Sequence, residues 1–213
     1  MSQPLPPLPD EPIILPSRWS EIWNTMLTHP SVETLGQLAR TPQATGNRAH
    51  LWIFLSALAG AVLASLVSAF VGALLDAPPV TRPTSLDLLM LSPVVALFEL
   101  LLFVIITNLL ILIARALGGK GVYSRLAYAL STFISPLILI SSVLSAIPVV
   151  NATNMLTALY GLGLTVVALR AITRLNWGKA VLTLALALGV VLALGACFII
   201  AVLPLLLQGN GGP

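Results

Sequence analysis

Charged side chains are scarce in this chain. They make up 8% of the 213 residues, whereas 58% of the residues are hydrophobic. Soluble domains carry about 25% charged residues, so this chain has too few charges to cover a protein surface in water. Its mean hydropathy of +1.02 indicates that lipid surrounds most of the chain. The composition therefore excludes a soluble globular domain.

Residues that carry chemistry are scarce as well. Cys197 is the single cysteine, so the chain can form no internal disulfide and no cysteine-based metal cluster. His29 and His50 both lie in the N-terminal region, without the second ligand that metal or haem binding would need. The signatures of zinc proteases, serine hydrolases and nucleotide-binding P-loops are absent. We expect a protein that is not an enzyme, and the sequence identifies no cofactor.

Five long apolar runs dominate the chain instead. The first has no charge in 25 residues, which at about 1.5 Å per residue exceeds the roughly 30 Å hydrocarbon core of a bilayer. The sequence predicts an all-α fold, a polytopic membrane bundle of five transmembrane helices over residues 51–207. The predicted spans are approximately 51–75, 88–114, 126–150, 155–171 and 180–207. Residues 151–154 are expected to form a tight polar turn, and the alternative is that the third and fourth runs form a re-entrant pair.

The residues before and after these runs differ in character. Residues 1–16 contain six prolines and predict a disordered tail. Residues 17–50 predict a cytoplasmic, interfacial amphipathic region, because Trp19 and Trp23 share one face of a short helix suited to lipid headgroups. The alternative is that this helix docks on the protein's own spans. Ser31 is placed to cap a second short helix, and residues 208–213 form a C-terminal tail.

The basic residues alternate between loops. Nine of the ten precede the first run, or lie between the second and third runs or between the fourth and fifth: Arg18, Arg40, Arg48, Arg115, Lys120, Arg125, Arg170, Arg174 and Lys179. Only Arg82 lies in another loop. Basic loops remain on the cytoplasmic side, so we expect a multi-pass protein of the cell inner (cytoplasmic) membrane, with its N-terminus in the cytoplasm and its C-terminus outside. Because these charges sit at span ends, they do not indicate nucleic-acid binding.

Three polar side chains in or beside the spans are candidate site residues. Glu99 is the only acid well inside a span, where a charge costs about 2.5–3.5 kcal/mol, so it should face the bundle interior or be protonated. We interpret it as a hydrogen-bonded carboxyl that fixes helix packing, and the alternative is a proton or cation site. Asn108 predicts an interhelical hydrogen bond. Candidate partners of Glu99 are Asn154, Ser141, Ser142 and Ser145.

Small residues recur every four positions in two runs, a pattern that lets helices approach closely. In the first run they are Gly60, Ala64, Ser68 and Gly72, and in the fifth they are Ala185, Gly189, Ala193, Cys197 and Ala201. The pattern does not decide whether these faces pack within the chain or against another protein. Pro136 is expected to kink the third span.

Four stretches carry a family resemblance. They are the Gly-rich loop 116–121, Ser135-Pro136-Leu137 with Ala146-Ile147-Pro148, Leu159-Tyr160-Gly161 through Leu169-Arg170-Ala171, and Asn176-Trp177-Gly178-Lys179-Ala180. With them the chain resembles the bacterial branch of the Yip1-domain membrane proteins, over roughly residues 17–207 and most clearly over 116–182. The resemblance implies an amphipathic N-terminal helix followed by five spans. The Asp-Leu-Tyr-Gly-Pro segment of eukaryotic members is absent, so the resemblance implies fold and topology more than their Rab-dependent role in vesicle traffic.

Three functions are compatible with these features. The first is a non-enzymatic scaffold or accessory subunit that packs against other membrane proteins in the bilayer, for example in a respiratory or photosynthetic complex. The second is a small ion or solute transporter or channel that uses Glu99. The third is a membrane-organising or trafficking factor, which is an analogy with the Yip1 family.

Overall fold

The computed structural model describes residues 18–74, 85–146 and 151–209. They form helices only, which confirms the all-α prediction: α1 (Trp19–Thr28), α2 (Val32–Leu38), α3 (Gly46–Leu74), α4 (Ser85–Ala116), α5 (Tyr123–Ser145), α6 (Asn151–Thr173) and α7 (Trp177–Gly209). The predicted tail at 1–16 and the last four residues of the predicted C-terminal tail lie outside the described residues.

Helices α3 to α7 are each long and apolar enough to cross a membrane. This confirms the prediction of five candidate spans. The predicted turn at 151–154 is wrong, because α6 already begins at Asn151. Short polar side chains suit the first turn of a helix as well as a loop. Helix α5 continues through Pro136, and the predicted kink there stays a prediction.

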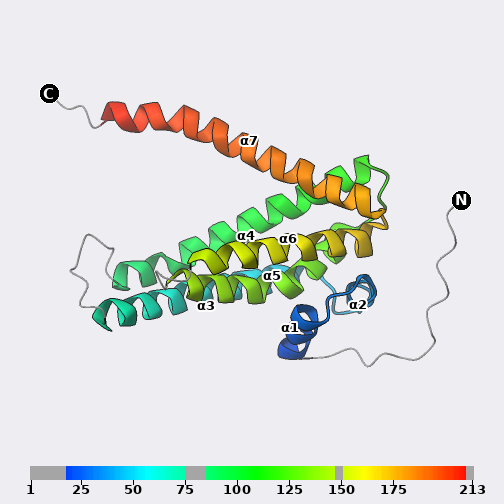
Figure 1. Ribbon diagram of the computed structural model, residues 1–213, viewed down its shortest axis with the longest axis horizontal. Helices are drawn as coiled ribbons and strands as arrows, with labels where there is room; N and C mark the ends of the chain where they lie inside the picture. Colours follow the sequence, from blue (N-terminus) through cyan, green and yellow to red (C-terminus); the bar gives the residue numbers. More distant parts are fainter. Residues whose placement is uncertain (1–17, 75–84, 147–150, 210–213) are drawn as a thin grey trace, which may run out of the picture.

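The long helices α3 to α6 lie lengthwise beside one another (Figure 1). Helix α3 contacts both α4 and α5, and α5 also contacts α6. Helix α7 contacts α4 and α6, and Figure 1 shows that it then diverges from the bundle along its length. The short helices α1 and α2 lie at one end, where α1 contacts α5 and α2 contacts α6.

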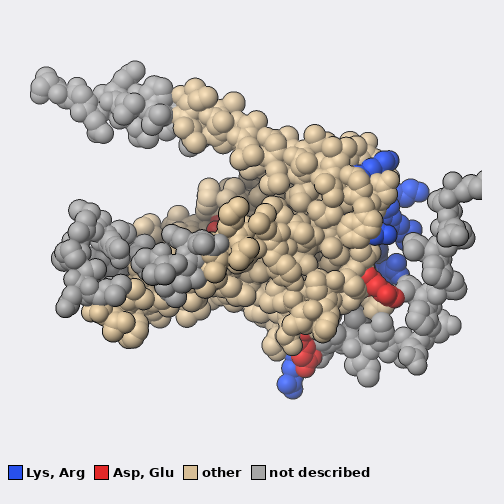
Figure 2. Space-filling view, viewed as in Figure 1, with Lys and Arg blue, Asp and Glu red and all other residues tan. Residues whose placement is uncertain are grey.

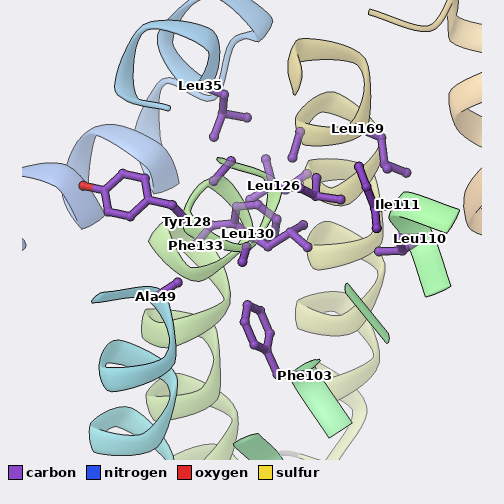
Figure 3. Close-up of a cluster of buried hydrophobic side chains, with 14 of the residues drawn as sticks. Leu35, Ala49, Phe103, Leu110, Ile111, Leu126, Tyr128, Leu130, Phe133 and Leu169 are labelled. Atoms are coloured by element: carbon purple, nitrogen blue, oxygen red, sulfur yellow. The ribbon is translucent and has the colours of Figure 1, made fainter. Parts of the chain in front are cut away.

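Helix α5 is the centre of the fold. About 56% of its apolar segment is buried inside the protein, compared with 28% or less for each other span. Figure 3 shows Leu126, Leu130 and Phe133 of this helix among side chains of α2, α4 and α6. The buried hydroxyls of Ser131 and Thr132 donate to carbonyls of their own helix at 2.8 and 2.7 Å. These bonds within the helix let α5 bury both hydroxyls, whereas the buried Ser135 Oγ has no partner among the described residues.

Helix α3 approaches α5 closely at Gly60. A Cβ atom placed there would lie 2.7 Å from Ser142 Oγ and 3.1 Å from Ser142 Cβ. In the same predicted stripe Ala64 and Ser68 are half-buried, and the side-chain position of Gly72 is outside the description. Apolar side chains gain little from leaving lipid for protein, so close backbone approach of this kind is a main source of helix association in membranes.

We predict that Gly60→Leu destabilises the protein by about 1–3 kcal/mol, because the new side chain meets Ser142 in a packed interface. Thermal unfolding in detergent, followed by size-exclusion chromatography, measures this change. Gly163→Leu is the matched control, since no atom lies within 4 Å of a Cβ at that position. Equal melting temperatures for the two variants would contradict the proposed contact.

Candidate functional site

The basic residues gather at one end of the bundle. Figure 2 shows most of the Lys and Arg atoms on the face where α4 ends, α5 begins, α6 ends and α7 begins. Six of them belong to these four helix ends and the two loops between them: Arg115, Lys120, Arg125, Arg170, Arg174 and Lys179. No acidic residue occurs in the chain after Glu99. The described acids nearest to these cations are Glu21 and Glu33 on the short helices α1 and α2, and Figure 2 shows acidic atoms beside the basic ones. Six cations against two acids leave this end with a net positive charge.

The first of the two loops is built on glycine. Gly118 has a φ of +91°, a left-handed conformation that glycine adopts without strain. The N–H of Gly119 donates to Ala114 O at 2.8 Å and the N–H of Gly118 donates to Arg115 O at 3.0 Å. This pair of bonds is a Schellman cap that ends α4 and turns the chain back towards α5.

The glycine loop lies directly against the end of α6. The N–H of Lys120 donates to Thr173 O at 3.1 Å. A Cβ atom at Gly121 would lie 2.8 Å from Thr173 Cγ2 and 2.9 Å from Ile111 Cδ1. Only glycine fits this approach without a shift of its neighbours. We call residues 117–122 and 174–176 together the loop junction.

Three cations hold the loop junction in place. Lys179 Nζ donates to Leu117 O at 2.9 Å, and an Nη atom of Arg115 donates to Gly121 O at 3.3 Å. The guanidinium of Arg170 lies 4.4 Å from the centre of the Trp177 ring, within the range of a cation–π interaction. At the start of α7, Asn176 Oδ1 accepts from the N–H of Lys179 at 2.9 Å, which is an N-terminal cap.

The other three cations of this end are free to meet a ligand. The side chains of Lys120, Arg125 and Arg174 are exposed, and the described residues provide none of them with a hydrogen-bond or ion-pair partner. Arg174 also has a φ of +58°, in the left-handed region where a non-glycine residue costs roughly 1–2 kcal/mol. It follows the last residue of α6, where a positive charge interacts favourably with the helix dipole.

An aromatic cluster attaches α1 to the same end of the bundle. Trp52 of α3 is fully buried, and its ring centre lies 5.4 Å from Trp19, 6.3 Å from Trp23 and 5.4 Å from Tyr128. The Arg48 guanidinium lies 5.0 Å from the Trp52 ring. Neither Trp23 Nε1 nor Trp52 Nε1 has an acceptor within the described part of the chain. Ring packing, rather than hydrogen bonding of the indoles, holds this cluster.

The apolar face of α1 packs on the protein's own spans, which was the alternative to a position in the headgroup region. Ile22 and Met26 are each only 1% exposed. Tyr160 Oη of α6 also donates to Leu27 O at 2.8 Å. Trp19 remains 38% exposed, so contact with lipid headgroups through this ring stays a prediction. Ser31 accepts from the N–H of Thr34 at 3.0 Å and caps α2, as predicted.

The polar residues predicted in the spans do not form one site. Glu99 is exposed on α4, so it does not face the interior of the bundle, and the other expectation, that its carboxyl is protonated, stays a prediction. It lies at the edge of the buried stripe that includes Ala96 and Phe103. Asn108 is also exposed, and its Nδ2 donates to Val104 O of its own helix at 2.8 Å rather than across helices. Asn154 is half-buried, and its Oδ1 has no partner among the described residues.

The serines that were candidate partners of Glu99 make other contacts. Ser141 and Ser145 donate to carbonyls of their own helix, Ile138 O at 3.1 Å and Ser142 O at 2.8 Å. Ser142 faces Gly60. Across the described ranges no three His, Cys, Asp or Glu side chains lie close enough to hold a metal ion.

Sequence reasoning did not identify several residues that organise this end. Trp52 and Thr173 carry no local pattern that separates them from other apolar or polar residues of a span. The His50 Nε2 and Tyr123 Oη atoms are 2.9 Å apart, a hydrogen bond between residues distant in sequence. Asn176 could have been found, since an Asn just before an apolar run is a typical N-terminal cap.

We predict that Trp52→Ala lowers the free energy of unfolding by about 3–5 kcal/mol. The substitution should also release α1, because the Trp52 ring contacts both tryptophans of that helix. Trypsin should then cleave at Arg40, between α2 and α3, faster than in the unchanged protein. Trp177→Ala is the matched control, since the same side chain is removed there from a position that is 48% exposed. Equal cleavage rates in both variants would show that the cluster does not hold α1.

Comparison with known families agrees with this architecture. The family model of the Yip1 domain matches residues 23–200, which is well over half of the chain and includes the loop junction and every member of the aromatic cluster except Trp19. No curated protein and no solved structure matches the chain. The matched region contains all five candidate spans, and α7 continues beyond it to Gly209. The chain is therefore a multi-pass integral membrane protein and belongs to the Yip1-domain family.

Proposed function

We propose that this protein is a non-enzymatic scaffold or accessory subunit that packs against a transmembrane helix of another membrane protein, such as a subunit of a respiratory or photosynthetic complex. The main observation behind this proposal is that much of α7 is not covered by the other helices. Among the described side chains of α7, the buried ones are Ala180, Thr183 and Ala187, which all lie in its first half. Beyond Ala187, every side chain described up to Ile200 is exposed.

The exposed face of α7 is shaped for a helix. Ala185, Gly189 and Ala193 lie on it, and no atom lies within 4 Å of a Cβ at Gly189. Leu192 and Leu194 beside them are 72% and 65% exposed. A groove of small residues between larger ones admits the backbone of a partner helix. The equivalent stripe of α3 is occupied by α5 at Gly60, which supports the same use of the stripe on α7.

Glu99 supports the same proposal. A charged carboxylate that faces lipid at the centre of a span costs about 2.5–3.5 kcal/mol, and this side chain is exposed on α4. A partner helix that covered α4 and donated a hydrogen bond would offset that cost. A transporter or channel would instead need connected polar side chains, and Glu99, Asn108 and Asn154 share no hydrogen bond within the described structure.

We also propose that the N-terminus lies in the cytoplasm and the C-terminus outside, in the cell inner membrane. The gathering of cations at the end where α3, α5 and α7 begin supports this orientation, because basic loops stay on the cytoplasmic side. Membership of the Yip1-domain family is compatible with a role in organising membranes, which a scaffold would also fulfil.

Mild-detergent extraction should recover the protein in a larger assembly, and Gly189→Leu should release it, because the new side chain fills the groove on α7. Co-purified proteins and elution volume measure the assembly. Val190→Leu is the matched control, since Val190 is an exposed neighbour outside the small-residue stripe.

Two outcomes would contradict the scaffold proposal. One is a monomer with no co-purified protein under these conditions. The other is ion flux in liposomes that Glu99→Gln abolishes without unfolding the protein, because a transporter or channel would produce that result.

A further inference from the structure

We infer that the loop junction and the first turn of α5 together form a binding site for the phosphate group of an anionic phospholipid, with Lys120, Arg125 and Arg174 as its contacts. The inference starts from charge. The six cations of this end come from four helix ends and the two loops between them, and they outnumber the acids of α1 and α2 at this end, Glu21 and Glu33. Such a surface attracts a multiply oxygenated anion and repels other cations.

The structure divides the six cations into two sets. Arg115, Lys179 and Arg170 are engaged by the protein itself, through Gly121 O, Leu117 O and the Trp177 ring. Orientation by basic loops explains all six positions, but it does not require that three of them be fixed and three left free. The three cations that bind the protein itself hold the loops in one conformation. The three free cations are therefore already in place before a ligand arrives, which lowers the entropy lost on binding.

The free cations lie at the depth of lipid headgroups. The neighbouring candidate spans end or begin at Ala116, Tyr123, Thr173 and Trp177. Lys120, Arg125 and Arg174 lie within a few residues of these ends. Tyr123 and the exposed Trp177 are aromatic residues of the kind that mark the membrane–water interface. Basic pockets between spans at this depth bind anionic headgroups, whereas a soluble acidic protein would need cations that extend further from the bilayer.

Arg174 adds an observation from the backbone. Its φ of +58° is one that glycine or asparagine adopts with less strain, yet the chain has an arginine there. An arginine can bind phosphate oxygens through two parallel N–H donors. The substitution Arg174→Asn therefore removes the charge at a position where the fold accepts the new residue.

Affinity for phosphatidylglycerol tests the inference. The purified protein is titrated with this lipid in phosphatidylcholine nanodiscs, and bound lipid is counted by native mass spectrometry. The test variant is Lys120→Gln with Arg174→Asn. The matched control is Arg18→Gln with Arg40→Gln, which removes the same charge from exposed residues outside the loop junction. Nanodiscs expose both faces of the membrane, so the result is independent of orientation.

We expect the test variant to bind phosphatidylglycerol roughly thirtyfold more weakly, at about fivefold for each charge, and the control to lose less than about threefold. Equal losses in both variants would overturn the inference, because the attraction would then be diffuse. Unchanged affinity in the test variant would also overturn it.

Two further measurements complete the test. Inorganic phosphate that displaced the lipid at matched concentration would identify a free anion as the ligand and overturn the assignment to lipid. If the double variant elutes as an aggregate, Arg125→Gln alone replaces it, since this residue is exposed in the first turn of α5. The single variant should bind about fivefold more weakly, and unchanged binding would overturn the inference.

Discussion

The close packing of α5 against its neighbours is the interaction on which the rest of this structure depends. In lipid, apolar side chains gain little by leaving the solvent, so helices associate through shape and polar contacts. Helix α5 meets the requirement of shape, with Gly60 of α3 against Ser142, and its buried hydroxyls of Ser131 and Thr132 are satisfied by carbonyls of their own helix. Helices α3 and α6 both pack on α5, and α7 in turn packs on α6. The packing of α5 therefore determines where the helix ends that carry the basic residues lie and where α7 begins.

The two ends of the bundle are organised by different forces. At the basic end, hydrogen bonds from Lys120 and Lys179 connect the loop between α4 and α5 to the end of α6 and the start of α7, and Arg115 donates within that loop. Trp52 brings α1 to the same end by ring contact. Along α7 no such contacts continue past Ala187 among the described side chains. A rigid, charged end and an uncovered helix together describe a protein suited to holding lipid and a partner helix in the membrane.

Composition and hydropathy were sufficient to predict the helical class, the number of candidate spans and the common end of the basic residues. The same reasoning failed where one pattern permits two environments. The stripes of α3 and α7 look alike, yet Gly60 is packed and Gly189 is not. Likewise, the apolar face of α1 could have entered the headgroup region or docked on protein, and Ile22 and Met26 show that it docks.

Other features depended on contacts that a local pattern does not contain. Glu99 is exposed although Ala96 and Phe103, three and four positions away on α4, are buried, and hydropathy alone does not show which side of a helix the bundle covers. The polar residues at 151–154 suit a turn or a helix start equally, and α6 begins there. The loop junction required Thr173 to meet Gly121, two residues separated by the whole of α5 and α6. In a membrane protein, span number follows from composition, whereas the pairing of helix faces follows from packing.

A disulfide between α3 and α5 tests the central packing most directly. A Cβ at Gly46 would lie 3.9 Å from Ser124 Cβ, within the separation that a disulfide spans. With Cys197 replaced by Ser, the pair Gly46→Cys and Ser124→Cys should oxidise to a single bridged species, and the pair Gly36→Cys and Ser124→Cys should not. Two free thiols that react with maleimide in the first pair, in folded protein under oxidising conditions, would contradict the account.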